Sequence, residues 1–249
     1  MRYSRPSFPS PIFALLVLMA SLVAPGLAAP PELVLFNGKN TDGWRPPLGT
    51  WSAVASVSLN AGAPRDFTAA PGEGILLNSA TGRTSNLLSV PEFADVEAHI
   101  EFCLPRGSNS GIYFMGRYEV QIFESWGVQD LQYTDCGGIY ARWNKEEKRK
   151  FEGHAPRVNA SKPAGEWQTF DIVFRAPRFD AAGHKTENAR FLKVVHNGVT
   201  IHENVEVTGP TNAAAFADEK PLGPLMLQGD HGPVAFRNLR ITPSDSQTP

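Results

Sequence analysis

The sequence has no surplus of basic residues and no cysteine pattern typical of a metal site. Its 249 residues hold 23 Lys and Arg against 25 Asp and Glu, a formal net charge of −2. Proteins that bind nucleic acid neutralise phosphates with a basic surplus, so no nucleic-acid partner is expected. The two cysteines, Cys103 and Cys136, form no CxxC pair and no Cys/His zinc spacing.

Long amphipathic helical patterns are absent as well. Glycine (22 residues) and proline (21 residues) are frequent, and both break helices. No segment of adequate length repeats apolar residues at helical spacing, which argues against a helical bundle and against a parallel α/β fold. The content of 42% hydrophobic and 19% charged residues is typical of a globular protein.

The N-terminus has the layout of a secretory signal peptide. Arg2 and Arg5 precede an apolar stretch, 12–23, and the small residues Ala28 and Ala29 suit a cleavage site. The apolar stretch is shorter than the ~20 residues of a membrane span, although an uncleaved anchor is the alternative. We therefore expect export to the periplasm or the extracellular space, with no membrane association after cleavage.

Export would place both cysteines in an oxidising compartment. Cys103 and Cys136 then either form a disulfide or remain two buried free thiols. The distance between their Cα atoms decides between these alternatives, and the sequence leaves both open.

Alternation of apolar and polar residues predicts a chain of short strands. The alternation is clear in 96–102, 118–122 and 170–175, and Asn197-Gly198 is a hairpin turn signal between two β-prone runs. Many short strands at such spacing are typical of an all-β antiparallel sandwich.

No internal repeat and no low-complexity linker divides the chain. We expect a signal peptide over 1–29, one domain over 30–241 and a flexible C-terminal tail over 242–249. Two segments within the domain are predicted to be loops, namely the Pro/Gly/Ala-rich 62–74 and the charged 143–156.

Seven short motifs, in a fixed order, resemble one known family. They are Leu35-Phe36-Asn37-Gly38-Lys39 with Asp42-Gly43-Trp44, Asn109-Ser110-Gly111-Ile112-Tyr113-Phe114 with Tyr118-Glu119-Val120-Gln121-Ile122, Asp135-Cys136-Gly137-Gly138-Ile139-Tyr140, Pro163-Ala164-Gly165-Glu166-Trp167-Gln168, Ala176-Pro177-Arg178-Phe179-Asp180, His196-Asn197-Gly198-Val199, and Leu225-Met226-Leu227-Gln228 with His231-Gly232. Together they resemble the 3-keto-disaccharide hydrolase domain family of bacterial secreted proteins. The resemblance implies a jelly-roll sandwich of the concanavalin A-like, glucanase-like type.

The resemblance also implies an enzyme that acts as a hydrolase or lyase on 3-keto-glycosides such as 3-keto-disaccharides. A ketone at C3 acidifies the hydrogen at C2, because the carbanion formed is an enolate. Elimination across C1–C2 followed by hydration then gives net hydrolysis. Such an enzyme needs a base near C2, an acid near the glycosidic oxygen and a donor for the enolate oxygen.

Glu119 and Gln121 are the first candidate pair. They stand two apart on a predicted strand, so both side chains leave the face opposite Tyr118, Val120 and Ile122. With the resemblance, this placement favours Glu119 as a proton-transfer group or metal ligand. The alternative is a solvated outer face.

His231 is the second catalytic candidate. It lies in a predicted turn after the run Leu225 to Gln228, in which Gln228 shares the face opposite the leucines. Histidine titrates near neutrality and suits acid/base work or metal ligation. A turn histidine bonded to the backbone is the alternative.

Other residues are expected to bind the sugar. Asn109 and Tyr113 can bind hydroxyl groups, and Tyr113 or Tyr140 can either stack on a pyranose or pack in the core. Arg117 and Arg142 are cationic candidates for the enolate. The full expected substrate-binding set is Asn109, Tyr113, Arg117, Gln121, Tyr140, Arg142 and Gln228.

The sequence leaves a divalent metal ion open as a cofactor. Glu119 and His231, with amide oxygens, can hold an ion that polarises the C3 carbonyl. Glu97, His99 and Glu101 are a second possible ligand row, although the sequence favours the alternative of an exposed outer sheet face.

Two other functions remain open at this stage. A non-catalytic carbohydrate-binding module uses the same sandwich fold. A conventional glycosidase needs a second acid beside Glu119, and Asp135 is the nearby alternative. The expected partner is a small sugar in each case, and the sequence does not fix the oligomeric state.

Overall fold

The computed structural model describes Met1 and residues 31–244. The predicted signal peptide therefore lies outside the described residues, apart from Met1. Every regular element in the described part is a β-strand, which confirms the all-β class. None of these residues forms a helix long and apolar enough to cross a membrane.

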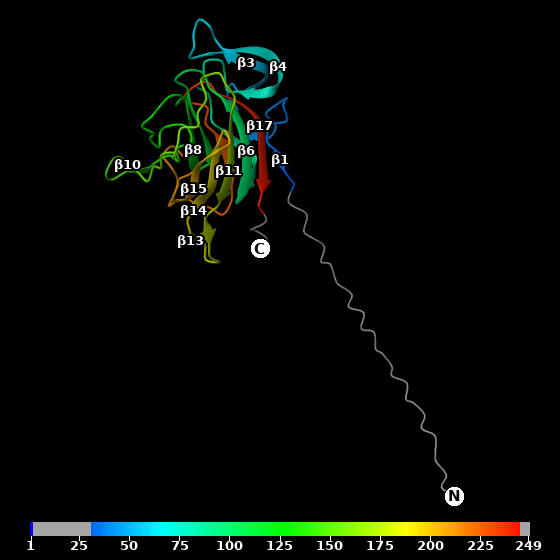
Figure 1. The fold of residues 1–249 in the computed structure, drawn as a ribbon, viewed down its shortest axis with the longest axis vertical. Helices are drawn as coiled ribbons and strands as arrows, with labels where there is room; N and C mark the ends of the chain where they lie inside the picture. The colour runs from blue at the N-terminus through cyan, green and yellow to red at the C-terminus, as the bar shows by residue number, and fades with distance from the viewer. Residues whose placement is uncertain (2–30, 245–249) are drawn as a thin grey trace.

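Two antiparallel sheets pack face to face as a jelly-roll sandwich (Figure 1). The larger sheet has the order β15-β14-β11-β6-β17-β4-β3, with β1 paired to β17. Its strands are β1 (Leu33–Val34), β3 (Ser52–Leu59), β4 (Phe67–Leu77), β6 (Val96–Cys103), β11 (Gln168–Arg175), β14 (Ala189–His196), β15 (Val199–Val207) and β17 (Ala235–Pro243).

The smaller sheet carries most of the candidate site residues. Its order is β2-β5-β16-β7-β8. These strands are β2 (Trp44–Arg45), β5 (Leu87–Phe93), β16 (Gly223–Leu227), β7 (Asn109–Phe114) and β8 (Tyr118–Phe123). Two separate hairpins complete the fold, formed by β9 (Arg142–Asn144) with β10 (Arg149–Phe151) and by β12 (Arg178–Phe179) with β13 (Lys185–Glu187).

The core lies between the two sheets and follows the predicted alternation. The side chains that enter this core are Val96, Ala98, Ile100 and Phe102 on β6 and Tyr118, Val120 and Ile122 on β8. Phenylalanines from both sheets meet there; for example, the rings of Phe114 and Phe174 have centroids 5.0 Å apart. Burial of each large apolar side chain stabilises the fold by ~1.5–3 kcal/mol, so this interior holds the sheets together.

A tight turn joins β7 to β8 and sets the register of the site. Met115 and Gly116 both have positive φ, 56° and 66°, as the two central residues of a type I′ hairpin turn require. The same geometry occurs at Asn197 (φ 50°) and Gly198 (φ 81°). That finding confirms the hairpin turn predicted between β14 and β15.

Three predicted loops or tails contain ordered strands. Strand β4 starts at Phe67 and pairs with β3 across a bulge, so most of 62–74 is not loop. The charged segment 143–156 contains the β9–β10 hairpin. Strand β17 extends to Pro243, opposite Val96, and so passes the predicted start of the tail. In each case pairing with a neighbouring strand overrides a composition typical of loops.

The two cysteines are unpaired thiols. Cys103 and Cys136 are both buried. Burial in apolar surroundings raises the pKa of each thiol to about 12, which keeps both protonated. Of the two alternatives left open by the sequence, the structure therefore has the free thiols.

Candidate active site

The site lies on the face of the smaller sheet that is turned away from the core. Tyr113 pairs directly with Glu119, and Gly111 pairs with Gln121. Met226 of β16 pairs with Tyr113 on its other side. Because paired residues share a face, side chains from β7, β8 and β16 converge there.

A second segment, 137–141, runs antiparallel beside the outer edge of β8. The Gln121 backbone N–H donates to Gly138 O at 2.8 Å, and the Tyr140 N–H donates to Glu119 O at 3.0 Å. The Asn212 N–H donates in turn to Ala141 O at 2.8 Å. Tyr140, Asn212 and Ala213 surround the pocket with Glu119. Glu119 is only 2% exposed, so the alternative of a solvated outer face does not apply to it.

A small cavity of about 40 Å³ remains on this face. It is lined by Asn109, Tyr113, Glu119, Gln121, Tyr140, Asn212, Ala213, Gln228 and His231. Both catalytic candidates and five of the seven candidate sugar-binding residues are thus brought together. Asn212 and Ala213 were not predicted, and nothing in their local sequence marks them as site residues.

Glu119 is a buried carboxyl group with an altered acidity. Burial raises its pKa to about 8. The Tyr113 hydroxyl, which donates to the carboxyl, and the Lys150 ammonium both lower this pKa, whereas the Asp230 charge raises it further. The desolvation effect is the largest, so Glu119 holds its proton at neutral pH.

A short hydrogen-bond chain orients Glu119. Gln228 Nε2 donates to Tyr113 Oη at 3.3 Å, and the Tyr113 hydroxyl donates to Glu119. Tyr113 is 1% exposed. Its ring is therefore packed rather than open for stacking on a pyranose, and its function in the site is carried by the hydroxyl.

Gly111 leaves the space that the Glu119 side chain occupies. A Cβ atom at this position would lie 2.3 Å from Glu119 Oε1 and 3.1 Å from Tyr113 Cε2. We expect Gly111→Ala to displace the carboxyl, with at least a tenfold loss of kcat/KM and a stability loss of ~1–3 kcal/mol. Thermal unfolding and steady-state kinetics measure both effects.

The matched control for this change is Gly62→Ala. A Cβ at Gly62 would have only Asn60 Oδ1 nearby, at 3.6 Å. It should leave kcat/KM and Tm unchanged. Full activity of Gly111→Ala would show that the Glu119 position is not critical.

His231 is paired with its sequence neighbour Asp230. His231 Nδ1 lies 2.6 Å from Asp230 Oδ1. An ionised carboxylate only accepts hydrogen bonds, so Nδ1 is the donor to Asp230, and in the neutral imidazole Nε2 keeps a lone pair. The alternative predicted from the sequence is a hydrogen bond from the imidazole to the backbone. The partner is instead the Asp230 side chain. The ring is 47% exposed on the pocket wall.

Lys150 is a site residue that sequence reasoning missed. Its ammonium donates to Tyr140 Oη at 2.7 Å and lies 4.5 Å from the centre of the Tyr140 ring. The cation covers one face of this ring, and the edge contact with Tyr133 (5.4 Å between centroids) fixes its orientation. In the sequence Lys150 is one of several charges in a polar run, so no local signal separates it from its neighbours.

Two amide oxygens in the pocket have no hydrogen-bond partner. They are Asn109 Oδ1 and Gln121 Oε1. Gln121 Nε2 donates to Thr134 O at 3.2 Å, which holds the amide while its oxygen stays unpaired. A buried acceptor without a donor costs free energy, so both oxygens are suited to accept hydroxyl groups of a ligand.

The two candidate arginines lie outside this pocket. Arg117 sits in the turn after β7, where its guanidinium donates to Met115 O (2.8 Å) and pairs with Asp218 (3.0 Å). Arg142 contacts Glu152 at 3.4 Å and lies over the Phe151 ring. Neither arginine lines the pocket, and each is held by a neighbouring carboxylate, so their role at the enolate stays a prediction.

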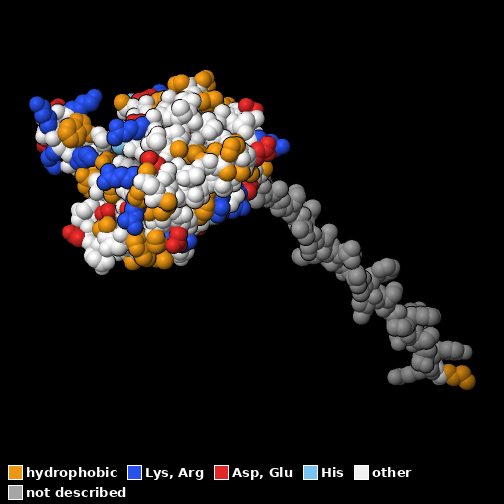
Figure 2. All heavy atoms as spheres, turned by 90° about the horizontal axis from the view of Figure 1, so that it is seen from above, with side chains coloured by type: hydrophobic (Ala, Val, Ile, Leu, Met, Phe, Trp, Pro, Cys, Tyr) orange, Lys and Arg blue, Asp and Glu red, His pale blue; other side chains and the backbone are white. Residues whose placement is uncertain are grey.

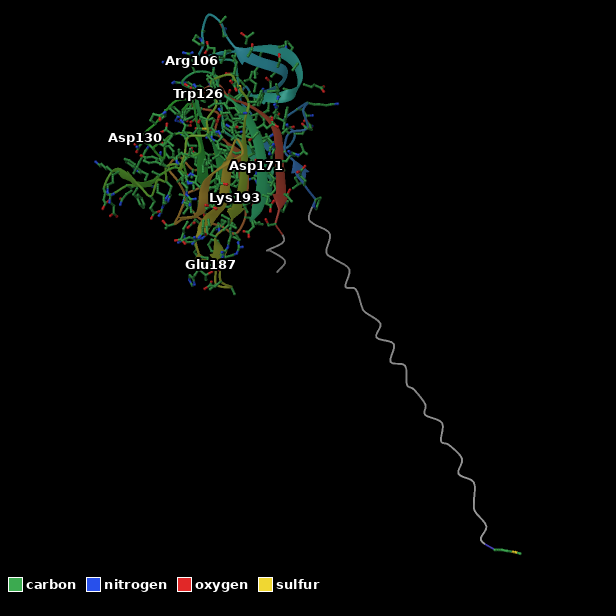
Figure 3. The ribbon with its side chains drawn as sticks, viewed as in Figure 1. Arg106, Trp126, Asp130, Asp171, Glu187 and Lys193 are labelled. Carbon is green, nitrogen blue, oxygen red and sulfur yellow. The ribbon has the colours of Figure 1, made fainter. Side chains whose placement is uncertain are left out.

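No metal centre is evident in the described part of the chain. These residues contain no group of three or more His, Cys, Asp and Glu side chains able to hold a metal ion. In the row Glu97, His99 and Glu101, the imidazole instead lies 2.6 Å from Asp171, which faces outward on the larger sheet (Figure 3). In the pocket itself, asparagines and glutamines supply amide oxygens. The lining contains no third His, Cys, Asp or Glu beside Glu119 and His231.

Asp135 is not a second acid for a conventional glycosidase. Its carboxylate accepts hydrogen bonds from Ser125 Oγ at 3.0 Å and from the Gln132 N–H at 2.8 Å. These contacts fix the loop after β8. Glu119 is the acidic residue that lines the pocket, so the pair of facing carboxylates used by such enzymes is missing there.

Comparison with known proteins supports the fold and the family. Two solved structures from Parabacteroides distasonis ATCC 8503, both only provisionally described as glycosyl hydrolases, have the same fold. The first is 24% identical with a TM-score of 0.58 over 85% of this chain and 83% of that one, and the second is 20% identical with a TM-score of 0.55 over 86% and 99%. A search of curated proteins finds no match. The family described as 3-keto-alpha-glucoside-1,2-lyase-like domain matches residues 32–242. Since this match spans nearly all of the sandwich, the chain belongs to that family, the one its motifs resemble.

Proposed function

We propose that the protein is an exported carbohydrate-active enzyme that cleaves 3-keto-glycosides by elimination across C1–C2 followed by hydration. The observation that carries this proposal is the shared pocket of Glu119 and His231. One is a buried carboxyl group protonated at neutral pH, and the other is an imidazole with a free Nε2. An acid and a base of these kinds are what the elimination requires.

The two residues take different steps. His231 Nε2 removes the proton at C2, and the electrons of this C–H bond form the enolate with the C3 carbonyl. The C1–O bond then breaks as the C1=C2 double bond forms, and Glu119 gives its proton to the leaving oxygen. Water subsequently adds across C1=C2, with the hydroxyl at C1 and the proton at C2. Asp230 keeps the imidazole in the tautomer that the first step needs.

Tyr140 is suited to stabilise the enolate oxygen. Its hydroxyl accepts a hydrogen bond from the Lys150 ammonium, so its own proton is free to be donated to the substrate. A donor polarised by a cation makes a stronger hydrogen bond to a developing negative charge. Lys150 thus supplies the positive charge for which the sequence suggested the two arginines.

Turnover of a chemically defined substrate tests the proposal. Purified protein is incubated with a 3-keto-glucoside and, in parallel, with the same glucoside unoxidised, each with and without added divalent cations and a chelator. Release of the alcohol from the ketone alone is expected. Failure to cleave it under any of these conditions would refute the proposal. A carbohydrate-binding module, the rival function, would bind sugar without any turnover and would be unaffected by Glu119→Gln.

The pH dependence gives a further prediction. Glu119 acts as an acid with a pKa of about 8, so kcat/KM should fall as pH rises through about 8. Lys150 lowers this pKa; therefore Lys150→Met should move the falling limb to higher pH and also lower kcat/KM at pH 7. A pH series of initial rates measures both.

Lys148→Met is the control for this charge change. Lys148 lies in the turn of the same hairpin with a φ of 50°, and its replacement removes an equal charge. The pH at which kcat/KM falls should be the same as in the wild-type protein. If Lys150→Met also leaves this pH unchanged, the fall in kcat/KM cannot be assigned to Glu119.

A further inference from the structure

The pocket around Glu119 is too small for a whole glycoside. Its volume is about 40 Å³, much less than a disaccharide occupies. On the proposed mechanism the reacting part of the substrate, around C1 to C3, lies at this pocket, and the leaving group lies against the adjoining surface.

A larger cavity adjoins the pocket. It has a volume of about 370 Å³ and shares the wall residues Asn212 and Ala213 with the pocket. Trp143, Phe216 and Lys145 also line it. Trp143 is 44% exposed, so an indole surface is open next to the site.

The β9–β10 hairpin connects the two cavities. Trp143 is paired directly with Lys150 across the hairpin, so their side chains share one face. Lys150 reaches Tyr140 in the pocket, while Trp143 lines the adjoining cavity. This hairpin projects from the sandwich in Figure 1, and Figure 2 shows basic side chains on the projection.

We propose that the cavity lined by Trp143 is the leaving-group subsite, which binds a second ring stacked on the indole. The inference rests on the proposed function and names the residue that selects the leaving group: Trp143 favours a ring over a small alkyl group. An indole face attracts both kinds of ring, through apolar C–H groups or through aromatic stacking. The basic side chain of Lys145 in the same wall can donate to ring substituents.

An exposed tryptophan elsewhere provides a matched control. Trp126 is 58% exposed and lies in the loop after β8 (Figure 3). It lines a cavity of about 540 Å³ that shares no wall residue with the pocket. Both tryptophans are exposed, and only Trp143 lines a cavity that adjoins the pocket.

Substrate comparison tests the proposal. With Trp143→Ala, kcat/KM should fall about five- to tenfold for a 3-keto-disaccharide or a phenyl 3-keto-glucoside, and less than twofold for the methyl 3-keto-glucoside. Trp143→Phe should keep most of the activity because it retains a ring. A larger loss for the disaccharide identifies a sugar as the preferred leaving group, and a larger loss for the phenyl glucoside identifies an aryl group. Trp126→Ala should leave all three substrates unchanged.

Binding provides a readout that does not need turnover. In the Glu119→Gln background, calorimetry should show that Trp143→Ala weakens binding of the disaccharide about five- to tenfold and leaves binding of the methyl glycoside unchanged. Equal effects of Trp143→Ala on all substrates, in kinetics and in binding, would overturn the subsite. If the wild-type protein cleaves no 3-keto-glycoside but the binding difference is present, the proposed reaction fails while the subsite stands.

Discussion

Replacing Glu119 by glutamine is expected to lower kcat/KM for 3-keto-glycosides by ~10²–10⁴-fold. Glutamine keeps the size of the side chain and its hydrogen bond from Tyr113, but it cannot give a proton to the leaving oxygen. Steady-state kinetics at pH 7 measure the loss. Substrates with a more acidic leaving group should be affected less, because they need less protonation.

The same variant should be folded, and above pH 8 it should be more stable than the wild-type protein. The pKa of Glu119 is raised from 4.5 to about 8 in the folded state, so the folded protein binds more protons than the unfolded chain between these values. Wild-type stability therefore falls as pH rises from about 4.5 to about 8. Glutamine has no charge to bury and should remove this decline, which amounts to about 5 kcal/mol at pH 9.

Denaturant unfolding at pH 5 and pH 9 measures this effect. The control is Glu97→Gln, which removes an exposed carboxylate from the outer face of β6 and should change neither the activity nor the slope of stability against pH. A Glu119→Gln protein that is fully active, or that loses stability at pH 9, would show that the carboxyl group is neither the acid nor buried as described.

His231→Gln should abolish removal of the hydrogen at C2. We expect a loss of ~10²–10⁴-fold in kcat/KM, because the amide offers no basic nitrogen in place of Nε2. Exchange of the C2 hydrogen of a 3-keto-glucoside with deuterated water, followed by NMR, should disappear in parallel. Glu119→Gln should retain this exchange, because the acid acts on a different bond.

The matched control for His231 is His184→Gln. His184 is also an exposed imidazole paired with a nearby aspartate, at 3.3 Å from Asp180, but it does not line the pocket. Its replacement should leave both rate and exchange unchanged. Persistent C2 exchange in His231→Gln would assign the base to another residue.

Much of the fold follows from local pattern. Alternation on 96–102 and 118–122 predicts which side chains enter the core, because consecutive residues of a strand point to opposite faces. The same rule places Glu119 with Gln121, and Gln228 opposite Leu225, as the structure has them. The alternation rule does not extend from Tyr113 to Arg117. The strand ends at the Met115-Gly116 turn, which changes the direction of the side chains that follow.

Amino-acid composition predicts loops in two segments where pairing with a neighbouring strand forms β-structure. Segment 62–74 has the residues of a loop, but β3 is its neighbour and gives its backbone groups partners in β4. The charged segment 143–156 forms a hairpin that delivers Lys150 to Tyr140 and Trp143 to the adjoining cavity. Charge alone does not say which lysine of a run faces a site, because this depends on the register of the hairpin.

The amino-acid sequence by itself determined the strands with clear alternation, the face of each of them that enters the core, and the presence of a carboxyl group, an imidazole and amides among the outward-facing residues. Only the tertiary structure decided that Glu119 and His231 line one cavity and that the Glu119 carboxyl is protonated. The physical reason is that face alternation is a local property of the backbone, whereas acidity depends on desolvation. The segments that exclude water from Glu119 come from distant parts of the chain, around Tyr140 and Asn212.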